Sequence, residues 1–197
     1  MILFFPLAFA AIDSEGDRQL AVRLQDRDPQ ALAELYDKYG RMAFSIIVRI
    51  VRDQGVAEDL TQETFLRVWN RMAGFDTEKG ALGPWVLTVA RNRAIDYLRS
   101  VDGRSRQNAI ELSATETPSV FVDLEANLIN SDRARQLKSA FTKLNDKQRT
   151  VIELAYFEGL SQTEMAERMK QPLGTVKTWV RSALQILRAE LEQVVPA

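Results

Sequence analysis

The sequence predicts an all-α protein made of two small helical domains joined by a flexible linker. Its apolar residues recur at steps of three and four over long stretches, which is the spacing of one helix face and not the alternation of a strand. The chain has only nine glycines and six prolines among 197 residues, so few positions interrupt these patterns. A polar stretch with weak periodicity, residues 101–131, separates two helical blocks.

The composition removes several classes of function. The chain has no cysteine and no histidine. Disulfides, thiolate nucleophiles, cysteine or imidazole metal sites and Ser-His-Asp triads are therefore excluded. The net charge is only −1, so any affinity for DNA has to come from local basic patches and not from bulk charge. We expect no catalytic residue, no cofactor and no metal site.

The first twelve residues, MILFFPLAFAAI, are almost wholly apolar. A helix that spans a bilayer needs about 20 such residues, and a secretory signal begins with a positive charge that this segment lacks. Ala8-Phe9-Ala10 does resemble a signal-peptide cleavage site. We expect residues 1–17 to be an extension that precedes the folded domain, and the protein to act in the cytoplasm.

The first helical block, residues 18–100, is expected to contain helices over residues 29–52, 56–72 and 85–100. Residues 74–84 hold three glycines and are predicted to form the loop between the second and third helices. The buried stripe of the first helix is expected to be Leu32, Leu35, Tyr36, Tyr39, Met42, Ala43, Ile46, Ile47 and Ile50.

The second of these helices has two different faces. Helical spacing places Ala57, Leu60, Thr64, Val68 and Met72 on the face expected in the core. Asp59, Gln62, Glu63 and Leu66 lie on another, mostly acidic face. Spacing alone leaves Phe65 and Trp69 open between core and half-exposed positions, and it favours an acidic face that is simply solvated.

The third helix carries polar residues on its second half. Asparagine and arginine are the side chains that make bidentate bonds to bases and phosphates. The residues expected to be exposed there are Asn92, Arg93, Asp96 and Arg99. Phe75 and Trp85, in and beside the preceding loop, could hold an unstacked base, although Trp85 taken alone fits a core position better.

The C-terminal part of the chain predicts two helices joined by a tight turn. Ser161 with Glu164, and Asn145 with Gln148, have the spacing of helix-starting caps, and the first pair is a capping box. Residues 171–174, Gln-Pro-Leu-Gly, break the helix that Ser161 starts, because proline lacks an N–H donor and glycine tolerates turn conformations. A second helix is expected to begin at the end of this segment.

This second helix has a polar, basic face opposite an apolar one. Its apolar stripe begins at Val176 and ends at Leu191, and no acidic residue lies between Glu167 and Glu190. The polar face consists of Lys177, Thr178, Arg181, Ser182, Gln185 and Arg188. This is the geometry of a helix that enters a DNA major groove, although a solvated basic face has the same pattern.

Three segments, in this order and at these separations, resemble a group IV sigma factor, the extracytoplasmic-function class of the bacterial RNA polymerase sigma family. They are AEDLTQETFLRVW from Ala57, PWVLTVARNRAIDYLR from Pro84, and LNDKQRTVIELAYFEGLSQTEMAERM from Leu144 with GTVKTWVRSAL from Gly174. The resemblance covers residues 18–192. It implies a sigma region 2 domain over residues 18–100, a linker over 101–131 and a sigma region 4 helix-turn-helix domain over 132–197.

The resemblance also implies three groups of site residues, and it replaces the solvated interpretation of the acidic helix. The β′ coiled coil of core polymerase would be bound by Asp59, Leu60, Gln62, Glu63 and Phe65. The −10 element would be opened and held by Phe75, Trp85, Asn92, Arg93, Asp96 and Arg99. The −35 element would be read by Thr175, Lys177, Thr178, Arg181, Ser182 and Gln185.

The implied partners are core RNA polymerase, through its β′ and β subunits, and promoter DNA with its −10 and −35 elements. An anti-sigma factor, which in this family is often membrane-anchored, would hold the protein inactive until a stress or envelope signal. No small-molecule substrate is implied. The sequence has no GxxxxGK[ST] motif, so DNA opening would be driven by binding energy and not by ATP.

Two alternatives remain from the residues alone. A stand-alone helix-turn-helix transcriptional regulator would bind its operator tightly without polymerase, but the acidic face and the third helix argue against it. A helical carboxylate enzyme would use Glu58, Asp59 and Glu63. Four-helix di-metal sites pair such acids with histidine, which this chain lacks.

Overall fold

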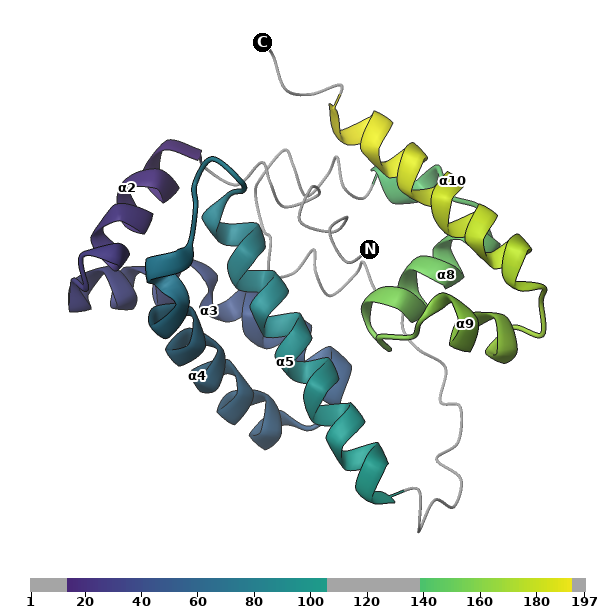
Figure 1. Cartoon of the computed structure of the whole chain (residues 1–197), viewed down its shortest axis with the longest axis horizontal. Coiled ribbons are helices and arrows are strands. Elements are labelled where there is room, and N and C mark those ends of the chain that lie inside the picture. Colours follow the sequence, from purple (N-terminus) through teal and green to yellow (C-terminus); the bar gives the residue numbers. More distant parts are fainter. Residues whose placement is uncertain (1–13, 106–138, 193–197) are drawn as a thin grey trace. The chain divides into compact units, whose positions relative to one another are not determined.

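The structure is a computed structural model that describes residues 14–105 and 139–192 (Figure 1). Within these ranges every regular element is a helix, which confirms the predicted all-α class, and the helices divide into two compact units. None of these helices is long and apolar enough to cross a membrane. The apolar N-terminal segment and most of the predicted linker lie outside the described residues.

The larger unit packs its helices around α3, which spans Pro29–Val51. Helix α2 (Ser14–Gln25), helix α4 (Gln54–Arg71) and helix α5 (Leu82–Ser105) all contact α3, and α4 also contacts α5. A short 3-10 helix, η1 (Met72–Gly74), follows α4 and leads into the loop before α5. Helix α3 is therefore the central element of this unit.

The sequence of α3 explains its start, its end and its burial. Asp28 caps the first turn by accepting from the Gln30 backbone N–H at 2.9 Å, and Pro29 occupies a position that needs no N–H donor. Arg52 ends the helix in a left-handed conformation, with φ of 57°, and its N–H donates to the Val48 carbonyl. The residues buried between these ends are Ala31, Leu35, Tyr39, Gly40, Ala43, Ile46, Ile47 and Ile50.

Tyr36 was expected in the buried stripe of α3, and this expectation is wrong. Its exposed fraction is 48%, whereas Leu35 and Tyr39 are fully buried. Successive helical residues are rotated by about 100°, so Tyr36 falls at the edge of a stripe that runs through Leu35 and Tyr39. Leu32 and Met42, which were also expected in the stripe, are half-buried.

Two helices begin earlier than predicted. In α4, the Asp53 carboxylate accepts from the Val56 backbone N–H at 2.9 Å and caps the helix ahead of the predicted start at residue 56. In α5, Pro84 lies in the first turn, where a missing N–H has no cost, so this helix begins before the predicted residue 85. Helix α5 also continues past residue 100, so the predicted start of the linker at residue 101 falls within it.

Helix α2 has no counterpart in the sequence-based expectations, because its apolar positions are few and most of its other residues are polar. It begins at Ser14, so the extension expected to end at residue 17 overlaps its first turn. Asp17 is 2% exposed, and its carboxylate accepts from the Tyr39 hydroxyl at 2.8 and 2.7 Å and from Lys38 at 3.0 Å. A buried carboxylate is costly without such donors, so these contacts hold α2 on α3.

The smaller unit contains α8 (Asp146–Tyr156), α9 (Gln162–Arg168) and α10 (Leu173–Glu192), which all contact one another. Their shared core is formed by Val151, Leu154, Met165, Ala166, Val176 and Val180. Trp179 packs against this core and is partly buried. The burial of apolar side chains from all three helices fixes α10 on α8 and α9.

Both predicted caps are present in the smaller unit. The Asn145 side chain accepts from the Gln148 backbone N–H at 2.9 Å, while the Gln148 side chain accepts from the Asn145 N–H at 3.0 Å. Ser161 and Glu164 make the same reciprocal pair at the start of α9. Each box satisfies two of the backbone donors that a helix start leaves unpaired.

The predicted break between α9 and α10 is also present. Lys170 takes a left-handed conformation with φ of 51°, which turns the chain after α9. The Pro172 carbonyl then accepts from the backbone N–H groups of Thr175 and Val176 at 3.0 and 3.2 Å. Helix α10 therefore begins at Leu173, slightly ahead of its predicted start.

Gly83→Ala is expected to destabilise the larger unit, whereas Gly80→Ala is not. A Cβ on Gly83 would lie 2.7 Å from a ring carbon of the buried Tyr39, while no atom lies within 4 Å of the same position on Gly80. Overpacking of this kind costs about 1–3 kcal/mol in the free energy of unfolding. Urea unfolding followed by hydrogen exchange of α3 and α5 amides measures it. Equal stability of the two variants would contradict the close approach of Gly83 to Tyr39.

Candidate functional site

The predicted polymerase-binding residues divide into an exposed and a buried group on α4. Asp59, Gln62 and Glu63 are exposed, and we call these three residues the acidic face. Leu60 and Phe65 are only 2% and 4% exposed, because their side of α4 is packed within the unit. That Leu60 and Phe65 contact polymerase directly stays a prediction, and the structure shows both side chains buried. They support the helix that carries the acidic face.

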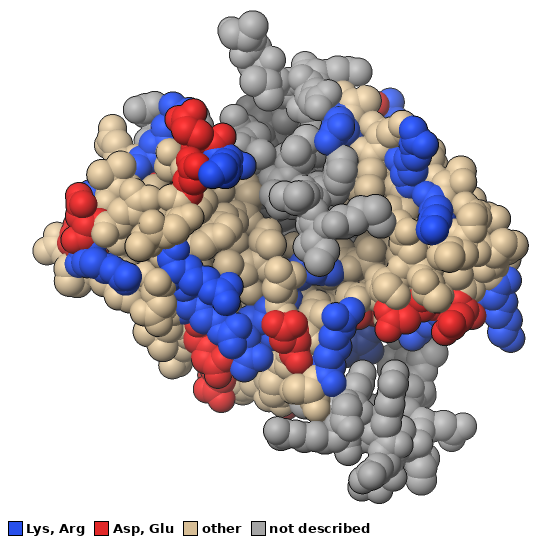
Figure 2. All heavy atoms as spheres, in the orientation of Figure 1, with Lys and Arg blue, Asp and Glu red and all other residues tan. Residues whose placement is uncertain are grey.

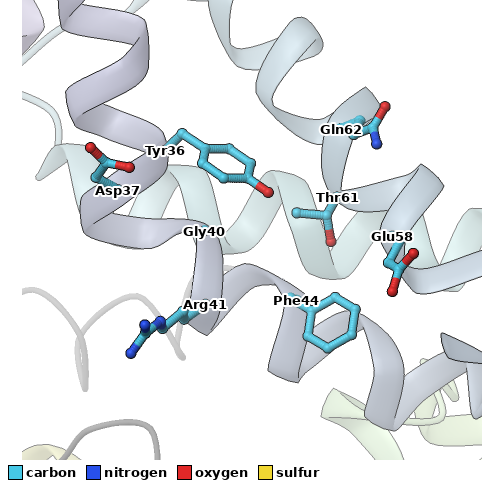
Figure 3. A pocket seen from close by; sticks show the side chains of 8 residues that line it. All are labelled: Tyr36, Asp37, Gly40, Arg41, Phe44, Glu58, Thr61 and Gln62. Atoms are coloured by element: carbon cyan, nitrogen blue, oxygen red, sulfur yellow. The ribbon is translucent and has the colours of Figure 1, made fainter. Parts of the chain in front are cut away.

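A groove lies beside the acidic face, between α3 and α4 (Figure 3). It has a volume of about 620 Å³ and is lined by Tyr36, Asp37, Gly40, Arg41, Phe44, Glu58, Thr61 and Gln62. Figure 3 shows the Tyr36 ring pointing from α3 toward α4. This ring meets Phe65 edge to face, with centroids 4.9 Å apart. The sequence analysis did not predict this groove. Its one sequence feature is that Tyr36 directly follows the core residue Leu35, which places the Tyr36 ring at the edge of the buried face.

The loop between η1 and α5 is organised at its start by Asp76. The hydrogen bond from Lys79, at 2.8 Å, and a second one from the Glu78 backbone N–H, at 3.0 Å, hold the pKa of Asp76 below its usual value. The Phe75 ring is 9% exposed and lies 4.8 Å from the Trp85 ring, centroid to centroid. Trp85 is half-buried. The two aromatic rings therefore pack against each other and are not free.

The four predicted polar residues of α5 do not form one group. Asn92 is half-buried, and its side-chain oxygen accepts from Arg91 at 3.0 Å. Asp96 and Arg99 are exposed further along the helix. Arg93 is half-buried and is engaged with α4. Arg93 therefore contacts α4, whereas Asn92 contacts its neighbour Arg91, and Asp96 and Arg99 are exposed.

An ion pair joins Arg93 to the acidic face. Its Nε donates to Glu63 Oε2 at 2.6 Å, across 30 residues of sequence. This hydrogen bond lowers the pKa of Glu63, and burial of the carboxyl opposes the shift. The exposed fraction of the side chain is 18% for Arg93 and 47% for Glu63. One predicted DNA-binding residue and one predicted polymerase-binding residue therefore hold each other in place.

The polar face of α10 has the exposure that a DNA-reading helix needs. Its exposed members are Lys177, Thr178, Arg181, Gln185 and Arg188. Thr175 is half-buried in the first turn, and the Thr178 hydroxyl donates to the Gly174 carbonyl at 2.9 Å. Long polar side chains that can reach base edges and phosphates are thus presented along one helix.

Ser182 contacts α8 in addition to lying in the predicted DNA-reading set. Gln148 Nε2 donates to the Ser182 hydroxyl oxygen at 2.9 Å, while the Gln148 side-chain oxygen is used in the cap of α8. Ser182 is half-buried as a result. Gln148 therefore ties the start of α8 to the middle of α10.

Charged residues of both signs occur on the face of the protein drawn in Figure 2. On the face drawn in Figure 2, Lys and Arg side chains lie among Asp and Glu side chains in both units. This mixture agrees with the net charge of −1. Attraction to DNA phosphates must then come from individual side chains, and we expect the free protein to bind DNA weakly.

The part of the chain that the structure describes holds no group of three His, Cys, Asp or Glu residues that could bind a metal ion. The acids considered for a carboxylate enzyme, Glu58, Asp59 and Glu63, belong to this part. Glu63 is paired with Arg93. No observation on these residues favours metal-dependent chemistry.

Comparisons with known proteins identify both units. Residues 35–104 match the family model of sigma-70 region 2, and residues 134–187 match that of sigma-70 region 4. The ECF RNA polymerase sigma factor SigK of Mycolicibacterium vanbaalenii is 33% identical over 184 residues, which cover 93% of this chain and 90% of that protein. SigK of Mycobacterium tuberculosis is 35% identical over 167 residues, which cover 84% of this chain and 88% of that protein.

The chain belongs to the extracytoplasmic-function class of the sigma-70 family of bacterial transcription initiation factors. The resemblance inferred from the three sequence segments is therefore confirmed. Among solved structures, that of an RsbN–BldN complex is similar at 27% identity and a TM-score of 0.38, and the match covers 86% of this chain and 97% of that chain.

Glu63→Gln is expected to destabilise the larger unit at pH 7 and to lose this effect on acidification. The hydrogen bond from Arg93 lowers the pKa of Glu63 below its ordinary value. The pair therefore stabilises the folded chain above that ordinary value, and this stabilisation is lost as pH falls through the folded pKa. The effect should be below about 1 kcal/mol, because Glu63 is half-exposed and solvent screens the pair. Urea unfolding at several pH values measures it, with the exposed Glu58→Gln on the same helix as control. A difference that stays constant with pH would contradict the assignment.

Proposed function

We propose that this chain is the promoter-specificity subunit of RNA polymerase, with core binding and −10 opening in the larger unit and −35 reading in the smaller one. The observation that carries the proposal is the match of the two helical units to sigma regions 2 and 4, in that order. We assign the chain no reaction of its own. The polymerase would supply nucleotidyl transfer, and both proteins would act in the cytoplasm.

We infer that the acidic face of α4 binds the β′ subunit of core polymerase. Asp59, Gln62 and Glu63 are exposed, and the adjoining groove adds the half-exposed ring of Tyr36. Carboxylates beside an accessible aromatic ring suit a partner that presents basic and apolar side chains together. Leu60 and Phe65 contribute by packing beneath this surface.

Asp59→Lys is expected to weaken binding to core polymerase about tenfold or more, because charge reversal turns an attraction across an interface into repulsion. Asp59 tests this face more cleanly than Glu63, since a lysine at residue 63 would also stand against Arg93. Asp26→Lys, an exposed acid outside α4, is the charge-matched control. Fluorescence titration of core enzyme with labelled chains measures the affinity. Equal affinities for the two variants would remove the acidic face from the interface.

We infer that residues 75–84, which comprise the loop after η1 and the first turn of α5, act with Asn92 to open the −10 element and hold an unstacked base. Unstacking costs a few kcal/mol, and a pocket recovers this energy only for a base that fits it. The side-chain oxygen of Asn92 accepts a hydrogen bond from Arg91, and the side-chain nitrogen would donate to a base edge. Asp96 and Arg99 would contact the duplex next to the opened bases.

Asn92→Ala is expected to leave closed-complex formation unchanged and to slow promoter opening about tenfold, since an unmatched base edge in the pocket costs about 1–3 kcal/mol. Permanganate reactivity of unpaired −10 thymines over time measures opening, and footprinting before opening measures the closed complex. Unaltered opening would exclude Asn92 from the pocket. A parallel loss of the closed complex would place it in duplex binding instead.

We infer that α10 reads the −35 element through Lys177, Thr178, Arg181 and Gln185, with Thr175 at its start. These positions are exposed or half-exposed on one helix whose opposite face is buried in the core of the smaller unit. Ser182 orients α10 through Gln148 and adds to the reading surface. Arginine in such a helix makes the bidentate contact to guanine that specifies a base.

Arg181→Ala is expected to weaken binding to the −35 element by about 1–3 kcal/mol and to relax its preference at one base pair. Arg188→Ala, the same substitution further along α10, serves as the control and should leave base preference unchanged. Competition footprinting by holoenzyme on promoters with single −35 substitutions measures both effects. Undiminished protection of the −35 element with unchanged base preference would contradict the assignment of Arg181.

We further propose that a protein partner, an anti-sigma factor, controls this chain. With no cysteine and no histidine, the chain has no thiol or imidazole with which to sense oxidants, zinc or pH near neutrality. A sensor must then lie in another protein, which can be anchored in the membrane. Purification of the chain from its own cells in a stable, inactive complex with another protein would support this proposal. A chain that carries no bound partner in the cell and is active under all conditions would contradict it.

A further inference from the structure

Helix α2 contacts the start of the loop that precedes α5. Its last residue, Gln25, donates from Nε2 to the Phe75 carbonyl oxygen at 2.8 Å. The Phe75 ring is buried, so this bond fixes the residue that anchors the loop. Directly after α2, Arg27 donates to the Trp69 carbonyl oxygen at 2.7 Å near the end of α4. The N-terminal end of the loop is therefore tied to α2 and to the turn that follows it.

The same helix contacts the other end of the loop. Asp17 Oδ2 accepts from the Gly83 backbone N–H at 3.4 Å, while both carboxylate oxygens accept from the Tyr39 hydroxyl. Asp17 is 2% exposed, so this polar cluster is buried. A Cβ on Gly83 would lie 2.7 Å from the Tyr39 ring, which shows how closely the first turn of α5 approaches. The C-terminal end of the loop therefore rests on Asp17 and Tyr39.

We propose that α2 is a rigid strut that positions the promoter-opening loop, with Gln25 and Asp17 as its positioning residues. These two residues lie on one unbroken helix, about 12 Å apart along its axis, so they hold the two loop ends at a fixed separation. Neither residue lies within residues 35–104, the part of the chain that matches the family model of sigma-70 region 2. The proposal rests on the proposed role of the loop in opening the −10 element.

Fixed loop ends would favour the capture of a base. A pocket compensates for unstacking only if its walls are in place when the base leaves the helix. A loop with loose ends would lose conformational freedom at that moment, which opposes opening. The contacts with duplex DNA and with core polymerase are proposed for other surfaces. The strut should therefore act on opening and on base choice, and not on the earlier binding steps.

Gln25→Ala tests the strut with little risk to the fold, because Gln25 is exposed and the substitution removes its bond to Phe75. The matched control is Gln19→Ala, another exposed glutamine on α2. Each chain is assembled with core polymerase on a duplex promoter fragment. The fragment is one that core polymerase transcribes when it carries the unaltered chain. The measurements are core affinity, closed-complex affinity, the rate of −10 permanganate reactivity, and the preference between the native and a substituted base at the unstacked position.

Gln25→Ala is expected to slow opening about fivefold, the effect of one net hydrogen bond, and to reduce base preference at the unstacked position. Core and closed-complex affinities should equal those of Gln19→Ala and of the unaltered chain. A purely structural role of Gln25 would change all of these together. Asp17→Asn places an amide donor against the donors of Gly83 and Tyr39, so it should slow opening further.

Unchanged opening and base preference in Gln25→Ala would overturn the proposal, and so would an equal loss of opening and core affinity. Asn92→Ala is measured alongside to separate two kinds of failure. If Asn92→Ala slows opening and Gln25→Ala does not, the strut alone is contradicted. If neither variant changes opening, the proposed function of the loop is contradicted with it.

Discussion

The buried carboxylate of Asp17 is the contact on which the arrangement of the larger unit depends. It accepts from the hydroxyl of Tyr39 on the central helix α3, from Lys38 beside it and from the Gly83 backbone at the start of α5. A carboxylate at 2% exposure is tolerated only if donors surround it, so the three helices cannot shift independently without leaving a buried charge unpaired. Gly83 allows the close approach that this cluster requires.

The proposed polymerase-binding and DNA-binding surfaces of the larger unit are also joined by an ion pair. Glu63 on the acidic face and Arg93 on α5 form an ion pair at 2.6 Å. The pair is partly exposed, so it contributes little to the free energy of unfolding. Its consequence is geometric, because it sets α5 against α4 at the point where polymerase and DNA contacts are proposed to meet. A single helical unit can thus present both surfaces in a fixed relation, which suits a protein that must bind polymerase and open DNA together.

The features that were predicted from the sequence are those that neighbouring residues determine. The two caps of the smaller unit, at Asn145 and Ser161, need only residues three positions apart, and the helical class follows from apolar spacing. The contact of Asp17 with Tyr39 spans 22 residues, and that of Glu63 with Arg93 spans 30, so no local pattern reveals them. Motif resemblance correctly identified the family. It did not distinguish exposed residues of the acidic helix from residues that pack beneath it. Helical spacing likewise misplaced the edge of the α3 stripe at Tyr36.

Reconstitution with core polymerase would show whether this chain confers promoter specificity on RNA polymerase. The chain would be added to sigma-free bacterial core polymerase, and run-off transcripts would be measured from a genomic fragment library. We expect transcripts that depend on the added chain and start downstream of one shared pair of −10 and −35 elements. Failure to associate with core polymerase, together with tight DNA binding by the chain alone, would contradict this expectation and indicate a stand-alone helix-turn-helix regulator.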